Sequence, residues 1–312
     1  MAEIVNNLVG FNSESGTVNL LLAAVGNDVV NVATGLGYSL NLNVNTSKNF
    51  AVFLNRIFLA NYETTGSYRP LTFNPDILKW GTQFVERTPD SKYIFPFKSR
   101  LYLGNCKFNA PGVPDDVEQN PVIYPSRVFY SDLYIGNTLT WGVDWDVRGS
   151  CTANTTLFKA FTSGEGAPRT GFKRYNIKIN DKLVVTNSAT AALAPTLINN
   201  YFTVKSIDSD FQLHTNENFP VTEDGIRFFV GSNWFDVAPG DGDQIKGFGE
   251  NSDRLLIFKL FSLWFYTGTQ LRQVKDAPGT SYNRSIINKR NKTYYFHGSD
   301  PNISGIYVYD GV

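Results

Sequence analysis

One local pattern recurs along the sequence and limits the folds open to it: an apolar stretch, a short polar turn, a basic residue and a second apolar stretch. Two apolar stretches of strand length around such a turn are typical of a β-hairpin. A long basic side chain at the turn exit can stay in water while its strand enters the core. The basic residues of the four copies are Arg56, Arg100, Arg254 and Lys292.

The copies are spaced like the blades of a β-propeller. Arg56 and Arg100 are 44 positions apart, and Arg254 and Lys292 are 38 positions apart, close to the roughly forty to fifty residues of one four-stranded blade. Further strands are expected around Arg127 and from Gly305 onward. We therefore predict an all-β fold, a propeller-like array of antiparallel β-hairpins, complete or incomplete, over residues 50–148 and 231–312. A β-sandwich with recurring hairpins is the alternative.

The repeat is interrupted between Arg127 and Arg254. Residues 149–171 are rich in Gly, Ser, Thr and Ala, as linkers are, and alternating strand patterns with turn residues follow them. This pattern predicts a linker and a small all-β insertion over residues 149–230. Residues 1–49 place glycines among small apolar residues and fit neither period, so we expect an N-terminal arm that orders only against a neighbour.

Charge and the scarcity of reactive residues narrow the function. The 28 Lys and Arg residues balance 28 Asp and Glu residues, which argues against a protein that grips nucleic acid or an anionic membrane. Cys106 and Cys151 have neither metal nor redox spacing and are expected to be packed free thiols. His214 and His297 lie outside any catalytic motif and are expected to be hydrogen-bonded or at the surface. No metal, cofactor or enzymatic activity is predicted.

No segment is expected to enter a membrane. The longest apolar run, residues 255–266, is interrupted by Lys259 and Ser262 and is far shorter than the roughly eighteen residues of a membrane helix. It is interpreted as a buried hairpin. Glu3 stands where a secretory signal would carry positive charge.

Carboxylates are the remaining abundant reactive groups. Asp144 and Asp146 lie beside Trp141 and Trp145, and two carboxylates with aromatic sugar platforms are the equipment of a glycoside hydrolase. The favoured interpretation is that the aspartates face solvent and the tryptophan between them is core. Asp-Gly-Asp at residues 241–243 is interpreted as a turn.

Basic residues gather at two places, Lys173-Arg174 and residues 289–292. Tyr294 and Phe296 follow the second patch and would have to be exposed to stack on nucleic-acid bases. Alternation along a strand puts both rings on one face, which is expected to be core. The basic turn is therefore interpreted as a solvated hairpin tip, and the abundant asparagines are assigned to turns.

A longer motif combines several of these residues. Asp241-Gly242-Asp243 with Ile245 and Gly247 precedes a hairpin that runs from Asp253-Arg254 to Ser262 and Trp264, and a strand from Gly305 ends in Tyr309-Asp310-Gly311; an earlier strand begins with Ser126-Arg127. Residues 50–145 and 235–312 thereby resemble the propeller-like β region of tail proteins from tailed bacteriophages, of the kind that forms the nozzle or tail tube of short-tailed phages.

The resemblance implies a structural virion protein, made in the host cytoplasm, in the tail nozzle, tail tube or portal-proximal neck. Its partners would be copies of itself in a ring and neighbouring tail or portal proteins, with DNA passing through without specific binding. Zero net charge suits such a conduit. Two alternatives remain: a carbohydrate-binding propeller or host-adsorption protein with Trp141 and Trp145 as sugar platforms, and, third, the glycoside hydrolase.

Overall fold

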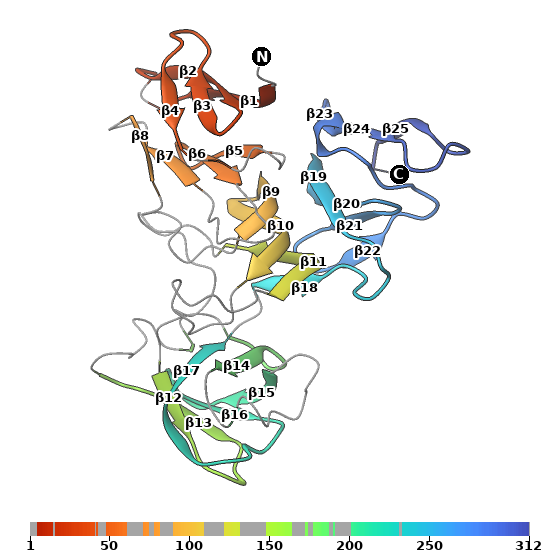
Figure 1. The fold of residues 1–312 in the computed structure, drawn as a ribbon. Coiled ribbons are helices and arrows are strands. Elements are labelled where there is room, and N and C mark those ends of the chain that lie inside the picture. Colours follow the sequence, from red (N-terminus) through yellow and green to blue (C-terminus); the bar gives the residue numbers. More distant parts are fainter. Residues whose placement is uncertain are drawn as a thin grey trace. The chain divides into compact units, whose positions relative to one another are not determined.

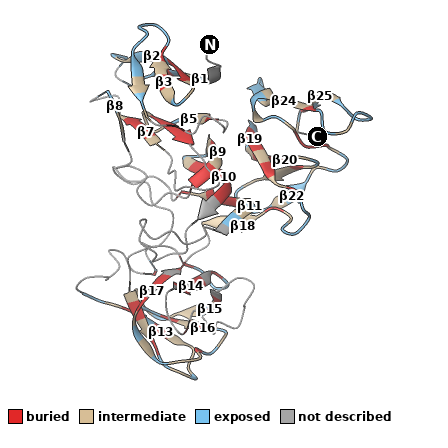
Figure 2. Cartoon of the chain, in the orientation of Figure 1, coloured by how far each residue is buried: buried red, intermediate tan, exposed pale blue. Residues whose placement is uncertain are grey.

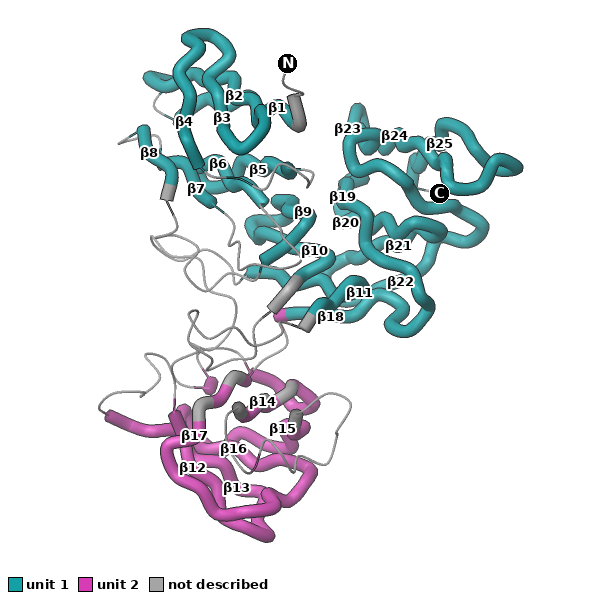
Figure 3. Tube along the Cα trace, in the orientation of Figure 1, with its two compact units in different colours: residues 1–108, 123–139, 234–312 teal, residues 109–122, 140–233 magenta. Residues whose placement is uncertain are grey.

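The computed structural model describes residues 5–14, 16–40, 42, 48–60, 71–74, 78–81, 90–108, 122–131, 148–163, 172–173, 177–186, 190, 201–230 and 233–311. The fold is all-β, a propeller-like array of antiparallel sheets, as the sequence predicts (Figure 1). The chain divides into two compact units (Figure 3). Unit 1 comprises Met1–Phe108, Ile123–Leu139 and Trp234–Val312, and unit 2 comprises Asn109–Val122 and Thr140–Asn233. Within the described part of the chain, no helix is long and apolar enough to cross a membrane.

The strands of unit 1 form sheets that follow one another along the chain. The first sheet contains β1 (Val5–Asn12), β2 (Asn19–Val25), β3 (Asp28–Asn31) and β4 (Gly37–Ser39); the second contains β5 (Asn49–Phe53), β6 (Arg56–Ala60), β7 (Leu71–Asn74) and β8 (Lys79–Gly81). The third contains β9 (Asp90–Phe97), β10 (Arg100–Phe108), β11 (Val122–Tyr130) and β18 (Trp234–Asp236). The fourth contains β19 (Ile245–Asn251), β20 (Arg254–Lys259), β21 (Leu263–Tyr266) and β22 (Leu271–Gln273), and the fifth contains β23 (Ile287–Lys289), β24 (Lys292–His297) and β25 (Gly305–Tyr309).

The predicted hairpins join the first two strands of the second, third, fourth and fifth sheets. Each basic residue of the pattern is the first residue of the second strand: Arg56 begins β6, Arg100 begins β10, Arg254 begins β20 and Lys292 begins β24. The turn between β9 and β10 has φ 45° at Lys98 and φ 58° at Ser99. Two left-handed residues in a two-residue turn match the twist of the strands that they join.

The first sheet corrects the expectation of an N-terminal arm. Residues 5–39 of the expected arm contain β1 to β4, and successive strands pair antiparallel. The turn between β2 and β3 uses Gly26, at φ 58°, followed by Asn27 and the acidic Asp28. This hairpin lacks the basic residue that identified the others, so the repeat pattern does not detect it.

Neighbouring sheets pack face to face, and the middle strands are therefore buried on both faces. In β20, Leu255 and Ile257 pack in a core with the third sheet, whereas Leu256 and Phe258 pack in a core with the fifth. Figure 2 shows buried residues, in red, in the strands of these sheets. A similar core between the first and second sheets contains Leu22. A strand buried on both faces has a continuous apolar sequence, which accounts for the run over residues 255–258.

The fifth sheet differs because only one face of β24 is buried. Thr293, Tyr295 and His297 are buried, whereas Tyr294 is exposed. The expectation that Tyr294 and Phe296 lie in the core is wrong for Tyr294, although register places both on one face. The alternation identified the shared face but not its direction, which depends on contacts with the fourth sheet.

Unit 2 contains a closed six-stranded barrel in the order β12 (Arg148–Cys151), β13 (Leu157–Ala160), β16 (Gln212–Thr215), β15 (Tyr201–Ile207), β14 (Lys182–Thr186) and β17 (Glu223–Val230). The residues predicted to form a linker and a small all-β insertion, 149–230, fall within this unit. The prediction of a linker is wrong for β12 and β13, which are strands of the barrel. Its core is rich in phenylalanine. Five phenylalanines are fully buried: Phe158, Phe172, Phe202, Phe219 and Phe228. In the chain the barrel lies between β11 and β18, which pair with each other in the third sheet.

Candidate functional site: polar clamps between sheets and an asparagine-lined pocket

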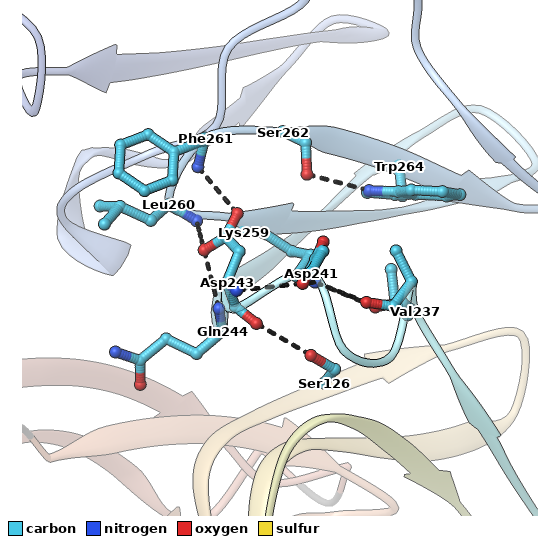
Figure 4. Close-up of polar contacts among 11 residues, drawn as sticks. Ser126, Val237, Asp241, Asp243, Gln244, Lys259, Leu260, Phe261, Ser262 and Trp264 are labelled. Carbon is cyan, nitrogen blue, oxygen red and sulfur yellow. Dashed lines mark hydrogen bonds and ion pairs between the residues drawn. The ribbon is translucent and has the colours of Figure 1, made fainter.

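The Asp-Gly-Asp loop before β19 holds a buried lysine (Figure 4). The Nζ atom of Lys259 lies 2.6 Å and 2.7 Å from the two carboxylate oxygens of Asp241 and donates to the carbonyl of Val237 at 3.0 Å. The Lys259 side chain is fully buried, whereas that of Asp241 is 36% exposed. Removing one partner would leave an uncompensated buried charge, so this ion pair constrains the loop strongly.

Asp243 completes the loop contacts through both of its carboxylate oxygens. Oδ1 accepts the Leu260 amide at 2.8 Å, and Oδ2 accepts the Phe261 amide at 3.0 Å. The Ser126 hydroxyl on β11 donates to the Asp243 carbonyl at 2.9 Å. Gly242, at φ 74°, permits the backbone to turn between the two aspartates. The loop therefore ties the β20–β21 turn of the fourth sheet to the third sheet.

We call the contacts of Lys259 with the Asp-Gly-Asp loop the Lys259 clamp. Arg127 makes a second clamp, between β11 and β18 of the third sheet. Its guanidinium binds the Asp236 carboxylate through Nε at 2.8 Å and Nη2 at 3.0 Å. The same group lies 4.2 Å from the ring centroid of Tyr124 and 3.6 Å from that of Trp234. A planar guanidinium can make both the two-point hydrogen bond and the ring contacts, which an ammonium group cannot.

The basic residues at turn exits also bind protein groups. Nη1 of Arg254 donates to the Tyr309 hydroxyl at 2.7 Å and to the Gly311 carbonyl at 2.8 Å, joining the fourth sheet to the end of the fifth. Nη1 of Arg100 donates to the Ser131 carbonyl at 2.7 Å. The expectation that such side chains stay in water is therefore incomplete, because these guanidinium groups have partners within the fold.

The remaining motif residues have structural surroundings. Arg56 is half-buried at the start of β6. The Trp264 indole donates to the Ser262 hydroxyl at 3.0 Å and packs against the core between the third and fourth sheets. Gly305 begins β25 opposite His297. Trp141, Trp145, Asp144 and Asp146 lie outside the described residues.

Asparagine side chains cross the junctions between sheets, a role that the sequence interpretation missed. The Asn7 amide donates to the Lys48 carbonyl at 2.8 Å, Asn49 accepts the Ile94 amide at 2.6 Å, and Asn288 accepts the Glu250 amide at 3.1 Å. An amide group can donate and accept, so it can satisfy backbone groups on a neighbouring sheet. The signal in the sequence is an asparagine within the first strand of a hairpin.

A pocket of about 460 Å³ lies beside these first strands. Its polar lining consists of asparagine amides and one guanidinium, and its apolar lining includes three phenyl rings. Amides with aromatic rings can bind a hydroxyl-rich ligand. The lining residues are Asn7, Leu8, Asn49, Phe50, Ile94, Phe95, Phe248, Asn283, Arg284, Ile286 and Asn288.

Both cysteines and His297 are buried, and both imidazoles have hydrogen-bond partners. Burial raises the pKa of the Cys106 thiol far above its usual value, and burial also raises that of Cys151, so neither is activated as a nucleophile. His297 is buried with Nδ1 3.1 Å from the Gly279 carbonyl, and Nδ1 of His214 lies 2.8 Å from the Thr156 hydroxyl. In the described ranges, no three His, Cys, Asp or Glu side chains group as metal ligands would.

No protein-family model matches the sequence, and neither does any curated protein sequence. The chain is weakly similar to the extracellular domain of a one-component system from B. thetaiotaomicron, with 11% identity and a TM-score of 0.29 over 98% of this chain and 38% of that one. It is also similar to the phage phi92 endosialidase, with 10% identity and a TM-score of 0.23 over 80% of this chain and 49% of that one. The chain thus spans less than half the length of either protein. Likeness at this level does not assign a function.

Proposed function

We propose that this chain is a non-enzymatic structural protein of a tailed-bacteriophage virion, a component of the tail nozzle, tail tube or portal-proximal neck. The observation that carries the proposal is the use of the Asp241-Gly242-Asp243 motif: its carboxylates hold Lys259 and the β20–β21 turn. Arg127 and Arg254 are likewise used to join strands and sheets. The residues behind the resemblance to tail proteins thus serve architecture.

Assembly and charge are part of the same proposal. Copies of the chain form a ring with neighbouring tail or portal proteins, and DNA passes through it without specific binding. The balance of 28 basic and 28 acidic residues supports this role, since a conduit with a strongly basic surface would retain the phosphate backbone.

The test is to purify virions produced by a genome that encodes this chain and to analyse them by quantitative mass spectrometry. The chain is expected at a fixed copy number relative to the portal protein, and particles made without its gene are expected to lack a functional tail. Absence of the chain from nuclease-treated, density-purified particles would contradict the proposal.

The pocket favours a second candidate, a carbohydrate-binding or host-adsorption protein. Its amides can bind sugar hydroxyls, and the phenyl rings of Phe50, Phe95 and Phe248 supply apolar surface for a sugar ring. The measurement is glycan-array binding by the full chain, followed by Asn283→Ala, with the exposed Gln273→Ala as a matched control. Loss of binding in the first variant alone supports this candidate, and the absence of glycan binding by the unaltered chain rejects it.

A further inference from the structure

The outward face of the fifth sheet is apolar and exposed. Ile306 is 77% exposed, Ile287 57%, Val308 49% and Tyr294 36%. The strand register aligns these residues across the sheet: Ile287 is opposite Tyr294, Tyr294 is opposite Val308, and Phe296 is opposite Ile306. We call this surface the C-terminal face.

The outward face of the first sheet has the same character. Leu8 is 54% exposed and Leu21 is 44% exposed. Leu8 is opposite Ala23, and Ala23 is opposite Val30, so the three lie on one face with Leu21. Leu8 and Leu21 are the exposed members of this face, whereas Ala23 is buried, at 3% exposure, and Val30 is half-buried. The alternate residues Phe11, Leu22 and Val29 are buried against the second sheet. We call the surface of Leu8, Leu21, Ala23 and Val30 the N-terminal face.

Neither surface has the composition of a solvated sheet face. An antiparallel sheet with one face in water alternates apolar and polar residues, whereas the C-terminal face carries isoleucine, valine and aromatic rings. Residues of this kind make the buried cores between sheets, such as Leu256, Phe258 and Tyr295. Contiguous apolar patches of this kind mark interaction sites.

We propose that each of these faces is covered by a second copy of the chain, with the C-terminal face of one copy packed on the N-terminal face of the next. The described cores of unit 1 each lie between one sheet and a sheet that follows it along the chain: the first with the second, the third with the fourth, and the fourth with the fifth. The N-terminal face of the first sheet and the C-terminal face of the fifth sheet would form one further junction of this kind when they come from two copies of the chain. Such a heterologous contact can close into a ring, and this inference therefore deepens the proposed virion function and rests on it.

The alignment of the turns gives the contact a charge pattern. In the first junction the Glu14 amide, in the β1–β2 turn, donates to Asn55 in the β5–β6 turn at 3.0 Å. In the junction between the fourth and fifth sheets, Asn251 likewise donates to the carbonyl of Asn291 in the β23–β24 turn. The same alignment between copies brings the exposed Lys289 and Lys292 to the turn that carries Glu14 of the next copy. Opposite charges at this turn favour the head-to-tail arrangement over packing of two identical faces.

The test uses one charged substitution on each face of the full chain, Ile306→Asp and Leu21→Asp, with mass measured by light scattering after gel filtration. Both side chains are exposed, so the folded state should accept them, and far-ultraviolet circular dichroism checks this. The unaltered chain is expected to associate as its concentration rises. Each variant alone is expected to be monomeric, with the dissociation constant raised at least about tenfold.

A mixture of the two variants gives the decisive result. Each retains the face that the other has lost, so an equimolar mixture is expected to form a dimer that cannot grow further. Ile179→Asp, at a 63% exposed isoleucine in unit 2, is the matched control and is expected to associate like the unaltered chain. A Leu21→Asp chain that still dimerises alone would show C-terminal faces pairing with each other and would overturn the proposal, as would a monomeric unaltered chain or a monomeric mixture.

The failure of this contact and the failure of the proposed function are distinguishable. A chain that occurs in virions but gives a monomeric mixture loses only the head-to-tail contact. A chain that passes the mixing experiment but is absent from virions retains the contact and loses the virion role.

Discussion

The two units bury their apolar residues in different ways. The barrel of unit 2 closes its strand ladder and encloses one phenylalanine-rich core. Unit 1 divides its apolar residues among cores between successive sheets, and hydrogen bonds of hydroxyl and amide side chains cross those junctions. In an array of this kind each member depends on its neighbours, and its end members keep uncovered faces. In the barrel, all strands share one core. In unit 1, the stability is divided among several cores, and a further sheet can be added at either end of the series.

The largest expected effect is in the barrel. Phe228 is fully buried, with its ring centroid 4.7 Å from that of Phe158. Phe228→Ala should destabilise unit 2 by about 4 kcal/mol, because a buried cavity replaces the ring. Hydrogen exchange measured in increasing urea should show that the backbone amides of β12–β17 lose protection, whereas those of β19–β21 keep nearly normal protection. Phe228→Leu is the milder control. Equal loss in both units would contradict the separation of their cores.

The next largest effect is at the Lys259 clamp. Asp241→Ala should destabilise unit 1 by about 3 kcal/mol, because it leaves the ammonium group of Lys259 buried without its carboxylate. Adding Lys259→Met should restore most of the lost stability, since the buried charge is then removed. The measurement is the free energy of unfolding of the two variants, and a double variant no more stable than Asp241→Ala would refute this account of the clamp.

A smaller effect is expected at Arg127. Arg127→Lys keeps the positive charge but loses the two-point contact with Asp236 and the ring contacts, for about 1–2 kcal/mol. Faster hydrogen exchange should be confined to β11 and β18. The control is Arg272→Lys, at an exposed arginine in β22, and similar behaviour of the two variants would count against the clamp.

The smallest effect is a dependence on alkaline pH. Burial raises the pKa of Tyr295 to about 12, and Tyr307 adds to the rise. The unfolded chain loses this proton near pH 10, so the stabilisation is complete below pH 10 and is lost as pH rises toward 12, by about 1 kcal/mol over the first pH unit. Urea unfolding of unit 1 should weaken over this range, and Tyr295→Phe should reduce the slope. An unchanged slope would exclude Tyr295 as the source.

The sequence predicted the local parts of this fold better than its long-range contacts. Arg56, Arg100 and Arg254 located hairpins because turn chemistry acts over a few residues. The first sheet was missed because its Gly26 turn lacks a basic residue. Pairing of Arg127 with Asp236 joins positions separated by the whole barrel, and no local pattern encodes it.

In the candidate site too, the sequence shows the local motifs but not the contacts between residues that are distant along the chain. The Asp-Gly-Asp motif and the exceptional Lys259 within an apolar run were visible in the sequence, but their mutual contact was not. The hydrogen bonds accepted by the side chains of Asn49 and Asn288 depend on the approach of a neighbouring sheet. No local pattern in the sequence indicates them, so these asparagines are assigned to turns from the sequence alone. Register along β24 predicted a shared face for Tyr294 and Phe296, whereas the direction of that face depends on packing.

The position of the barrel between β11 and β18 affects the entropy of folding. Closing a flexible loop over residues 131–233 would oppose pairing of these strands. The first and last barrel strands, however, pair with each other, with Arg148 opposite Arg227, so a folded barrel brings its own entry and exit together. Early folding of the barrel would shorten the effective loop and speed completion of the third sheet. Because Phe129 lies opposite Trp234 at the end of β11, we expect β11 and β18 to remain paired when a short turn replaces the barrel.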